Sequence, residues 1–277
     1  MVRELLWREY GLCGTEERRQ FRETVCLLVR YHMTAPYIME KDKAEQRLMR
    51  MAANGALTAD FTLKHLFLLS KADANGKISE GNPKSEASVL LAGELAQEIS
   101  CYEKPFTFAS PYAEYAYLSG KTTDPHNHLY NNTQTTAVML CGLPGTGKDT
   151  YCQQCFPDWP MVSLDAIREE TGIPPVGSQK EVVQIARSRA KAFLRQRQSF
   201  VWNATSITPD IRSHFVKLCE DYHAYVRIVF LETAYDENLK RNQNRRKAVP
   251  PSVIDKMLSK LVLPERFEAH EIMWHCV

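Results

Sequence analysis

The fold of this chain is decided by the stretch Gly142-Leu143-Pro144-Gly145-Thr146-Gly147-Lys148-Asp149-Thr150, a glycine-rich loop with Gly-Lys near its end. The loop directly follows the apolar run 136–141. Glycines allow backbone N–H groups to close around an anion, and Lys148 adds a positive charge where the next helix begins. Such a loop between a strand and a helix commonly holds phosphates. The sequence therefore predicts that the chain binds a nucleoside triphosphate.

Short apolar runs alternate with helical patterns around this loop. We expect strands at 135–141, 161–164, 199–203 and 224–231, with helices between them. This alternation is typical of a parallel sheet covered by helices, and the strongly apolar run 225–231 suits a strand buried on both faces. Because ligands of such sheets bind at the carboxyl ends of the strands, we expect the site beside the 142–148 loop.

The first part of the chain has a different character. Helical patterns cover 2–9, 15–31, 43–54, 60–72 and 85–100, without strand signals, and the polar, turn-rich segment 119–135 follows. We therefore expect a smaller all-α domain over residues 1–130 and a P-loop α/β domain over residues 131–277.

Composition sets limits on the class of protein. The 277 residues are 44% hydrophobic and 25% charged, which suits a globular protein of about two domains. A net charge of +2 does not by itself indicate nucleic-acid binding, so such a role would depend on local arginine clusters. The eight cysteines are scattered and form no secreted disulfide pattern. With no apolar signal core and no membrane-spanning stretch, we expect a cytoplasmic protein.

Three further segments lie at or beyond the predicted strand ends. In the first, Asp165 is followed three residues later by Arg168. A carboxylate near a γ-phosphate can take the proton of an attacking hydroxyl, and an arginine one turn on can hold an anionic acceptor. The alternative is that Asp165 only caps a helix and Arg168 is a solvated surface residue.

In the second segment, Asn203 and Thr205 follow a strand, where they can contact an acceptor or metal-bound water, or serve only as turn residues. The third is the basic stretch 239–250, which we interpret as a helix followed by Pro250-Pro251. It is typical of a mobile lid that brings arginine onto a triphosphate, although a charged run is also often a solvated face.

These four segments, in this order and at these intervals, resemble the kinase domain of polynucleotide 5′-kinases that heal RNA or DNA ends. The resemblance covers about residues 135–277 and implies transfer of the γ-phosphate of ATP to a 5′-hydroxyl end of RNA or DNA. It implies an ATP site made of Gly142, Leu143, Gly145, Thr146, Gly147, Lys148, Asp149, Thr150 and Arg245. It makes Lys148, Asp165 and Arg245 catalytic, with Asp165 as the general base. Arg168 would hold the phosphate next to the acceptor nucleotide, and Asn203 with Thr205 would lie on the acceptor side.

Asp149 departs from the usual pattern, because the residue after the loop lysine is normally a Ser or Thr whose hydroxyl binds Mg²⁺. A carboxylate is a good ligand for Mg²⁺, but it repels phosphate unless the metal lies between them. We expect Asp149 to bind Mg²⁺ directly or through water.

The helical part resembles the closing part of an HD-type phosphohydrolase, which precedes the kinase in bacterial end-healing proteins. The resemblance is carried by 28–32, with His32, and by 69–73, with Asp73. The chain contains no His-Asp doublet, so the domain would be truncated or degenerate, and we expect no phosphohydrolase activity. Two other functions stay open for the second domain: a small-molecule kinase, and a binding module that ATP closes without phosphoryl transfer.

Overall fold

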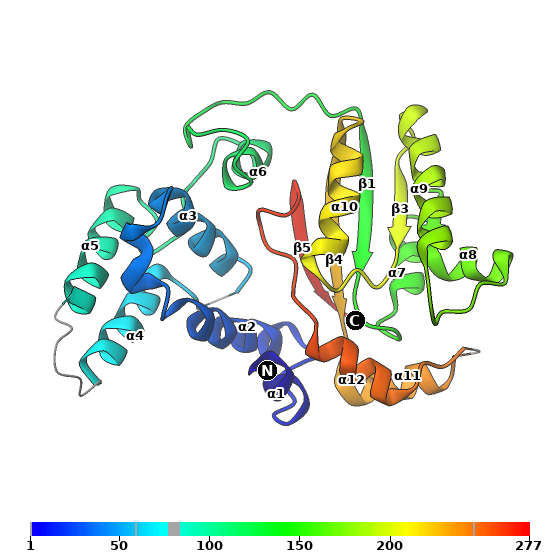
Figure 1. Cartoon of the computed structure of the whole chain (residues 1–277), viewed down its shortest axis with the longest axis horizontal. Coiled ribbons are helices and arrows are strands. Elements are labelled where there is room, and N and C mark those ends of the chain that lie inside the picture. The colour runs from blue at the N-terminus through cyan, green and yellow to red at the C-terminus, as the bar shows by residue number, and fades with distance from the viewer. Residues whose placement is uncertain (1, 59, 77–83, 246) are drawn as a thin grey trace. The chain divides into compact units, whose positions relative to one another are not determined.

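The computed structural model describes residues 2–58, 60–76, 84–245 and 247–277 (Figure 1). The chain divides into two compact units, a helical unit that ends at His128 and an α/β unit over Leu129–Val277.

The helical unit contains helices only, as far as its residues are described. Its elements are α1 (Val2–Arg8), α2 (Glu16–Tyr31), the 3-10 helix η1 (Ala35–Glu40), α3 (Ala44–Gly55), α4 (Leu63–Gly76), α5 (Lys84–Glu98) and α6 (Pro111–Leu118). Ile38, Leu48, Leu63 and Leu66 are fully buried in it. The expected all-helical character is confirmed. The sequence analysis missed η1 and α6. The sequence of α6 is apolar at most positions, so it shows no alternation of apolar and polar faces.

The α/β unit is built on a five-stranded, fully parallel sheet in the order β2-β3-β1-β4-β5. The strands are β1 (Thr135–Cys141), β2 (Met161–Ser163), β3 (Phe200–Asn203), β4 (Ala224–Glu232) and β5 (Glu271–Cys276). The predicted parallel sheet and its first four strands are confirmed. The fifth strand was not predicted, because it lies at an edge and Ile272 is its only buried residue.

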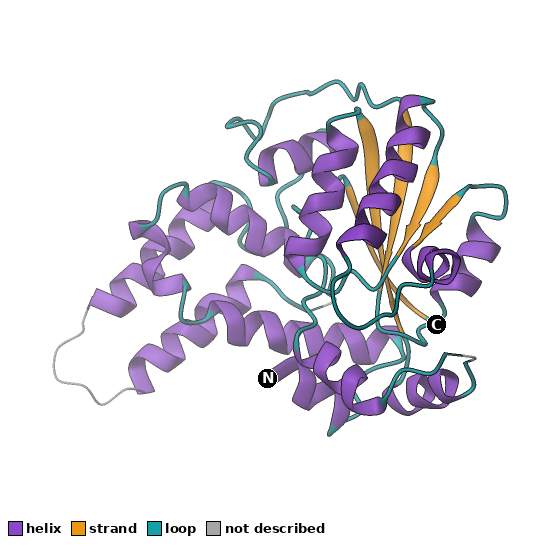
Figure 2. Ribbon diagram, turned by 45° about the vertical axis from the view of Figure 1, so that its right-hand side comes forward, coloured by secondary structure: helices purple, strands orange, loops and turns teal. Residues whose placement is uncertain are grey.

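Helices cover both faces of this sheet (Figure 2). On one face, Val138, Leu140 and Val201 form a core cluster with Cys152 of α7 (Lys148–Cys155). Because strand side chains alternate between faces, Phe200 points to the other face. There its ring lies 5.7 Å from that of Phe193 of α9 (Lys180–Arg195) and 6.1 Å from that of Phe215 of α10 (Pro209–Glu220).

The sheet order places the three strand ends that carry the predicted polar residues next to one another. β3 pairs with β2 on one side and with β1 on the other. β1 leads into the glycine-rich loop, β2 into α8 (Leu164–Thr171), and β3 ends at Asn203. Two helices, α11 (Tyr235–Gln243) and α12 (Pro251–Ser259), follow β4.

Candidate functional site

The glycine-rich loop has a backbone that only glycine accommodates at its key turns. Gly142 has a φ of 144°, and a Cβ there would lie 2.5 Å from the carbonyl oxygen of Leu231. Gly145 has a φ of 87°, and its Cβ would lie 3.0 Å from the carbonyl oxygen of Asn238. Side chains at these turns would be strained and would meet backbone atoms. The loop leads into the N-terminus of α7, whose unpaired N–H groups and dipole favour a phosphate.

Lys148 lies against the loop that precedes it. Its Nζ donates to the carbonyl oxygens of Gly142 at 2.9 Å and Leu143 at 2.7 Å. Burial lowers the pKa of Lys148 to about 8, with nearby Arg245 acting in the same direction. A bound triphosphate would favour the charged form, since opposite charges at close range stabilise each other.

This lowered pKa predicts a pH dependence of nucleotide binding. With the site empty, Lys148 loses its proton near pH 8, well below its ordinary value of 10.5. If the triphosphate requires the ammonium form, binding takes up a proton above this pH, and ATP affinity should fall by up to about tenfold per pH unit. Calorimetry at several pH values tests this. Lys148→Met should bind ATP more weakly but without this pH dependence, and a flat wild-type profile across pH 8 would contradict the prediction.

The lowered pKa of Lys148 has the opposite effect on the stability of the folded protein: ATP affinity falls as pH rises, whereas stability increases. Between the folded pKa of about 8 and the ordinary value of 10.5, the empty folded protein binds fewer protons than the unfolded chain. The contribution of Lys148 to the free energy of unfolding therefore rises with pH in that window.

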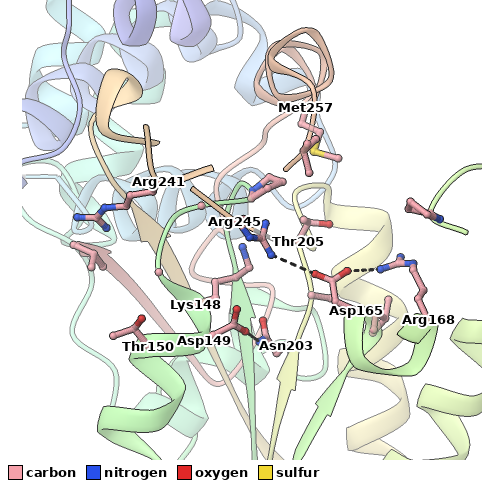
Figure 3. Close-up of a pocket in the computed structure, with 18 residues that line it drawn as sticks. Lys148, Asp149, Thr150, Asp165, Arg168, Asn203, Thr205, Arg241, Arg245 and Met257 are labelled. Atoms are coloured by element: carbon pink, nitrogen blue, oxygen red, sulfur yellow. Dashed lines mark hydrogen bonds and ion pairs between the residues drawn. The ribbon is translucent and has the colours of Figure 1, made fainter. Parts of the chain in front are cut away.

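Asp165 lies at the other side of the site, in the first turn of α8. Ser163 caps this helix by accepting from the N–H of Ala166, so Asp165 is not the capping residue. Its carboxylate pairs with Arg168, whose Nη1 lies 2.6 Å from Oδ1, and faces Arg245, whose Nη2 lies 3.8 Å from Oδ2 (Figure 3). The side chain of Asp165 is 74% exposed, so an acceptor can approach it from solvent.

The stretch 239–250 is only partly helical, in contrast to the prediction of a basic helix. α11 ends at Gln243, because Asn242 closes the following turn: its side chain donates to the carbonyl oxygen of Val249 and accepts from that residue's N–H. This turn carries Arg245 to Asp165 and Lys247 to Glu169, with Nζ 3.0 Å from Oε1. The rest of the basic run includes Arg246, which lies outside the described residues.

Asp149 and Asn203 are joined by a hydrogen bond. Asn203 Nδ2 donates to Asp149 Oδ1 at 2.5 Å, and Asn203 is buried at the end of β3. This contact places Asn203 beside the predicted metal ligand, in the cavity that Asp165 also lines. With Thr150 one residue further on in the same pocket, the site offers the oxygen ligands that Mg²⁺ prefers. These donors fit Mg²⁺: Asp149 would be its ligand, and Asn203 would orient the carboxylate.

Replacing Asp149 tests that assignment. We expect Asp149→Asn to raise the Mg²⁺ concentration needed for half-maximal nucleotide binding by roughly tenfold or more, because a charged oxygen ligand is lost. Asn203→Ala should have a smaller effect of the same kind, since it removes only the group that orients the carboxylate. Titrations of nucleotide binding with Mg²⁺ would measure both, and an unchanged Mg²⁺ requirement in Asp149→Asn would remove the residue from the metal site.

One cavity of about 610 Å³ unites most of the predicted residues. Those that line it are Gly145, Gly147, Lys148, Asp149, Thr150, Asp165, Arg168, Asn203, Thr205 and Arg245. Three predicted loop residues do not line it: Gly142, Leu143 and Thr146. They instead form the loop itself, where the Thr146 hydroxyl donates to the Leu143 carbonyl at 2.9 Å and the Gly142 N–H donates to the Thr205 carbonyl at 3.0 Å.

The sequence analysis missed the remaining lining residues, Pro144, Leu164, Pro175, Ala204, Arg241, Val249, Met257 and Val277. Arg241 lies in the basic stretch and is marked only by its charge. The others are apolar, and an apolar residue that lines a pocket carries the same sequence signal as one in the core.

Comparison with known proteins found similarity in the α/β unit. Residues 138–264 match the model of a family described as an AAA domain. Similar solved structures include a protein from Chloroflexus aurantiacus J-10-fl named as a putative kinase, with 16% identity, a TM-score of 0.43, and 52% of this chain and 86% of that chain covered. Another is a gluconokinase from Sinorhizobium meliloti 1021, with 17% identity, a TM-score of 0.36, and 51% and 83% covered.

The α/β unit is thus a P-loop α/β domain, and its residues 138–264 resemble an AAA domain. The match leaves the helical unit unassigned, and its resemblance to a phosphohydrolase stays a prediction. There the backbone carbonyl of His32 accepts from the Ser70 hydroxyl at 3.0 Å, which joins the end of α2 to α4. Across the residues that the structure describes, no helix has both the length and the apolarity that a bilayer crossing requires.

Proposed function

We propose that the α/β unit transfers the γ-phosphoryl group of ATP to a hydroxyl group. The observation that carries this proposal is that Lys148 and Asp165 line one cavity, with Arg245 near both. A phosphate-binding lysine and a solvent-accessible carboxylate on opposite sides of one pocket match the needs of an in-line displacement. A hydroxyl between Asp165 and the γ-phosphorus can attack while its proton moves to the carboxylate and the bond to the β-phosphate oxygen breaks.

The catalytic contribution of the protein is mainly position and charge. The N–H groups at the start of α7 and the Lys148 ammonium hold the triphosphate, and Arg245 stabilises the charge that spreads over the migrating group. Mg²⁺ held at Asp149 would add positive charge on the phosphates. Arg245 and Arg168 are both directed at Asp165. They keep that carboxylate oriented toward the cavity.

For the acceptor, we propose the 5′-hydroxyl end of a nucleic-acid strand. Two features support it. The exposed Asp165 leaves the acceptor side open, which suits the end of a polymer more than a small molecule that must be enclosed. Arg168 places a cation beside the base, where the phosphate that follows the terminal nucleotide of such a strand would lie.

A small hydroxyl compound is the second candidate acceptor. The guanidinium of Arg168 already has two partners, Asp165 and the Gln179 side chain, whose Oε1 lies 2.8 Å from Arg168 Nε. With these two partners, the role of Arg168 would be to position Asp165. A neutral acceptor has no phosphate and needs no further contact with this arginine. The family match gives no support for a polynucleotide over such a compound.

The test is phosphoryl transfer from labelled ATP to a panel of acceptors that contains 5′-hydroxyl RNA and DNA oligomers, sugars and nucleosides. Labelled oligomers would support the nucleic-acid acceptor, and labelled small compounds alone would support the second candidate. ATP binding without any labelled product would instead favour a binding module that ATP closes.

Arg168→Ala separates the two acceptors further. If Arg168 holds an acceptor phosphate, the variant should raise the KM for an oligonucleotide about ten- to a hundredfold, the range for a lost charged hydrogen bond. Its KM for ATP should stay close to that of the wild type. Steady-state kinetics measures both constants. A lower kcat with an unchanged acceptor KM would mean that Arg168 acts only through Asp165.

A further inference from the structure

A second hollow of the α/β unit runs along one side of α9. It is lined by Gln179, Lys180, Val183, Gln184, Arg187 and Lys191, together with Ser188. The spacing of positions 180, 184, 187 and 191 puts these side chains on one face of the helix. We call this face the α9 groove. It lies outside the triphosphate cavity, and of its lining residues only Gln179, which holds Arg168, has been given a role above.

The groove carries positive charge only. Its three cations are Lys180, Arg187 and Lys191, and its lining includes no acid. Within the described residues, none of these three side chains has a hydrogen-bonding or ion-pair partner. Arg189 of the same helix differs, because it pairs with Glu170 of α8. An unpaired row of cations on an otherwise nearly neutral chain indicates an anionic partner.

The groove begins at the acceptor side of the phosphate cavity. Gln179 lines the groove, and its Oε1 accepts from Arg168, which lines the cavity and pairs with Asp165. The amide of Gln179 also donates to the carbonyl of Pro174 at 3.0 Å, next to the cavity residue Pro175. Figure 1 shows α8, which carries Asp165 and Arg168, beside α9. One bound molecule can therefore extend from Asp165 into the groove.

We propose that the α9 groove binds the sugar–phosphate backbone of a nucleic-acid strand whose 5′ end lies at Asp165. This inference rests on the proposed nucleic-acid acceptor and assigns the surface that holds the strand beyond its first nucleotide. From Lys180 to Lys191 the helix rises about 16 Å, enough to follow several phosphates of one strand. Lysine and arginine that contact phosphates carry no sequence information, so the groove would accept any sequence. The exposed Val183 between them offers an apolar contact for a sugar or base.

The double variant Lys180→Gln and Arg187→Gln tests the groove. The KM for a 5′-hydroxyl oligonucleotide of about ten nucleotides should rise roughly tenfold, while the KM for a dinucleotide stays the same, because only the longer strand reaches the groove. The logarithmic salt dependence of binding should become shallower by about 1.4, or about 0.7 for each lost contact with a single strand. Lys217→Gln with Lys260→Gln is the matched control, since it removes two exposed cations outside the groove.

The outcomes separate the groove from the proposed reaction. Equal KM values and equal salt slopes in the groove and control variants, with the wild type phosphorylating oligonucleotides, would overturn the groove alone. If the wild type phosphorylates no oligonucleotide, fluorescence anisotropy with the labelled ten-nucleotide strand decides. Binding that the groove variant weakens would support the groove without the reaction, and absence of binding would overturn both.

Discussion

Asp165→Asn is expected to lower kcat about a thousandfold, within the range attributed to a positioned general base. Asparagine has nearly the same shape and can still accept a hydrogen bond from Arg168, so the pair at 2.6 Å loses its charge but not its geometry. What disappears is the ability to take the proton of the attacking hydroxyl. Steady-state kinetics with ATP and the preferred acceptor would measure the loss, and ATP affinity should remain within a few-fold of the wild type.

Glu169→Gln is the matched control for this variant. Glu169 lies on the same helix and pairs with Lys247, so its replacement also removes a carboxylate that faces the 243–250 turn. It does not line the cavity, and the pair is exposed, so we expect little change in kcat. A kcat for Asp165→Asn within a few-fold of this control would show that the carboxylate is not the base. Another group would then have to accept the proton.

The site residues that come directly after the strands were predictable from the sequence. β1 is a continuous apolar run that leads into Gly142, and a buried parallel strand followed by such a loop has few other interpretations. Because β3 lies beside β1 and β2 lies beside β3, all in parallel, the residues that follow them reach the same edge of the sheet. The convergence of Asp165 and Lys148 is therefore a consequence of topology.

Contacts between residues far apart in sequence were not predictable. The amide of Asn203 contacts Asp149, 54 positions away, and nothing in the sequence indicates this pair. The bonds of Lys148 to the Gly142 and Leu143 carbonyls also depend on the folded loop. Met257 of α12 lines the cavity, but nothing in the sequence distinguishes it from an apolar residue of the core. Strand order follows from general rules, but side-chain pairing depends on the packing of each particular residue.

The largest effect on stability is expected from Arg212→Ala. Arg212 is fully buried, and its guanidinium binds both carboxylate oxygens of Glu268, at 2.6 and 2.8 Å. It also donates to the carbonyl oxygens of Ser206 at 3.2 Å and Val262 at 2.8 Å. Removing one partner of a buried pair leaves the other charge uncompensated, which typically costs about 3–5 kcal/mol in the free energy of unfolding. Chemical denaturation would measure the loss.

Arg227→Ala is the matched control, because it breaks a similar ion pair that is not buried. Arg227 pairs with Glu271 at 2.7 Å, nearly the same separation, but both side chains are about one-third exposed. Exposed pairs contribute about 0–1 kcal/mol, so this variant should change the free energy of unfolding by no more than that. Equal effects of the two substitutions would mean that the buried network is not what holds this region.

The Arg212 network should also affect the nucleotide site. Through the Ser206 carbonyl it holds the loop after β3, and in that loop the carbonyl of Thr205 accepts from the Gly142 N–H at 3.0 Å. Loosening the loop therefore removes support from the first glycine of the phosphate loop. We expect Arg212→Ala to weaken ATP binding at temperatures where the protein is still folded, whereas Arg227→Ala should leave it unchanged. If Arg212→Ala lowers only the stability, the loop after β3 does not determine the conformation of the phosphate loop.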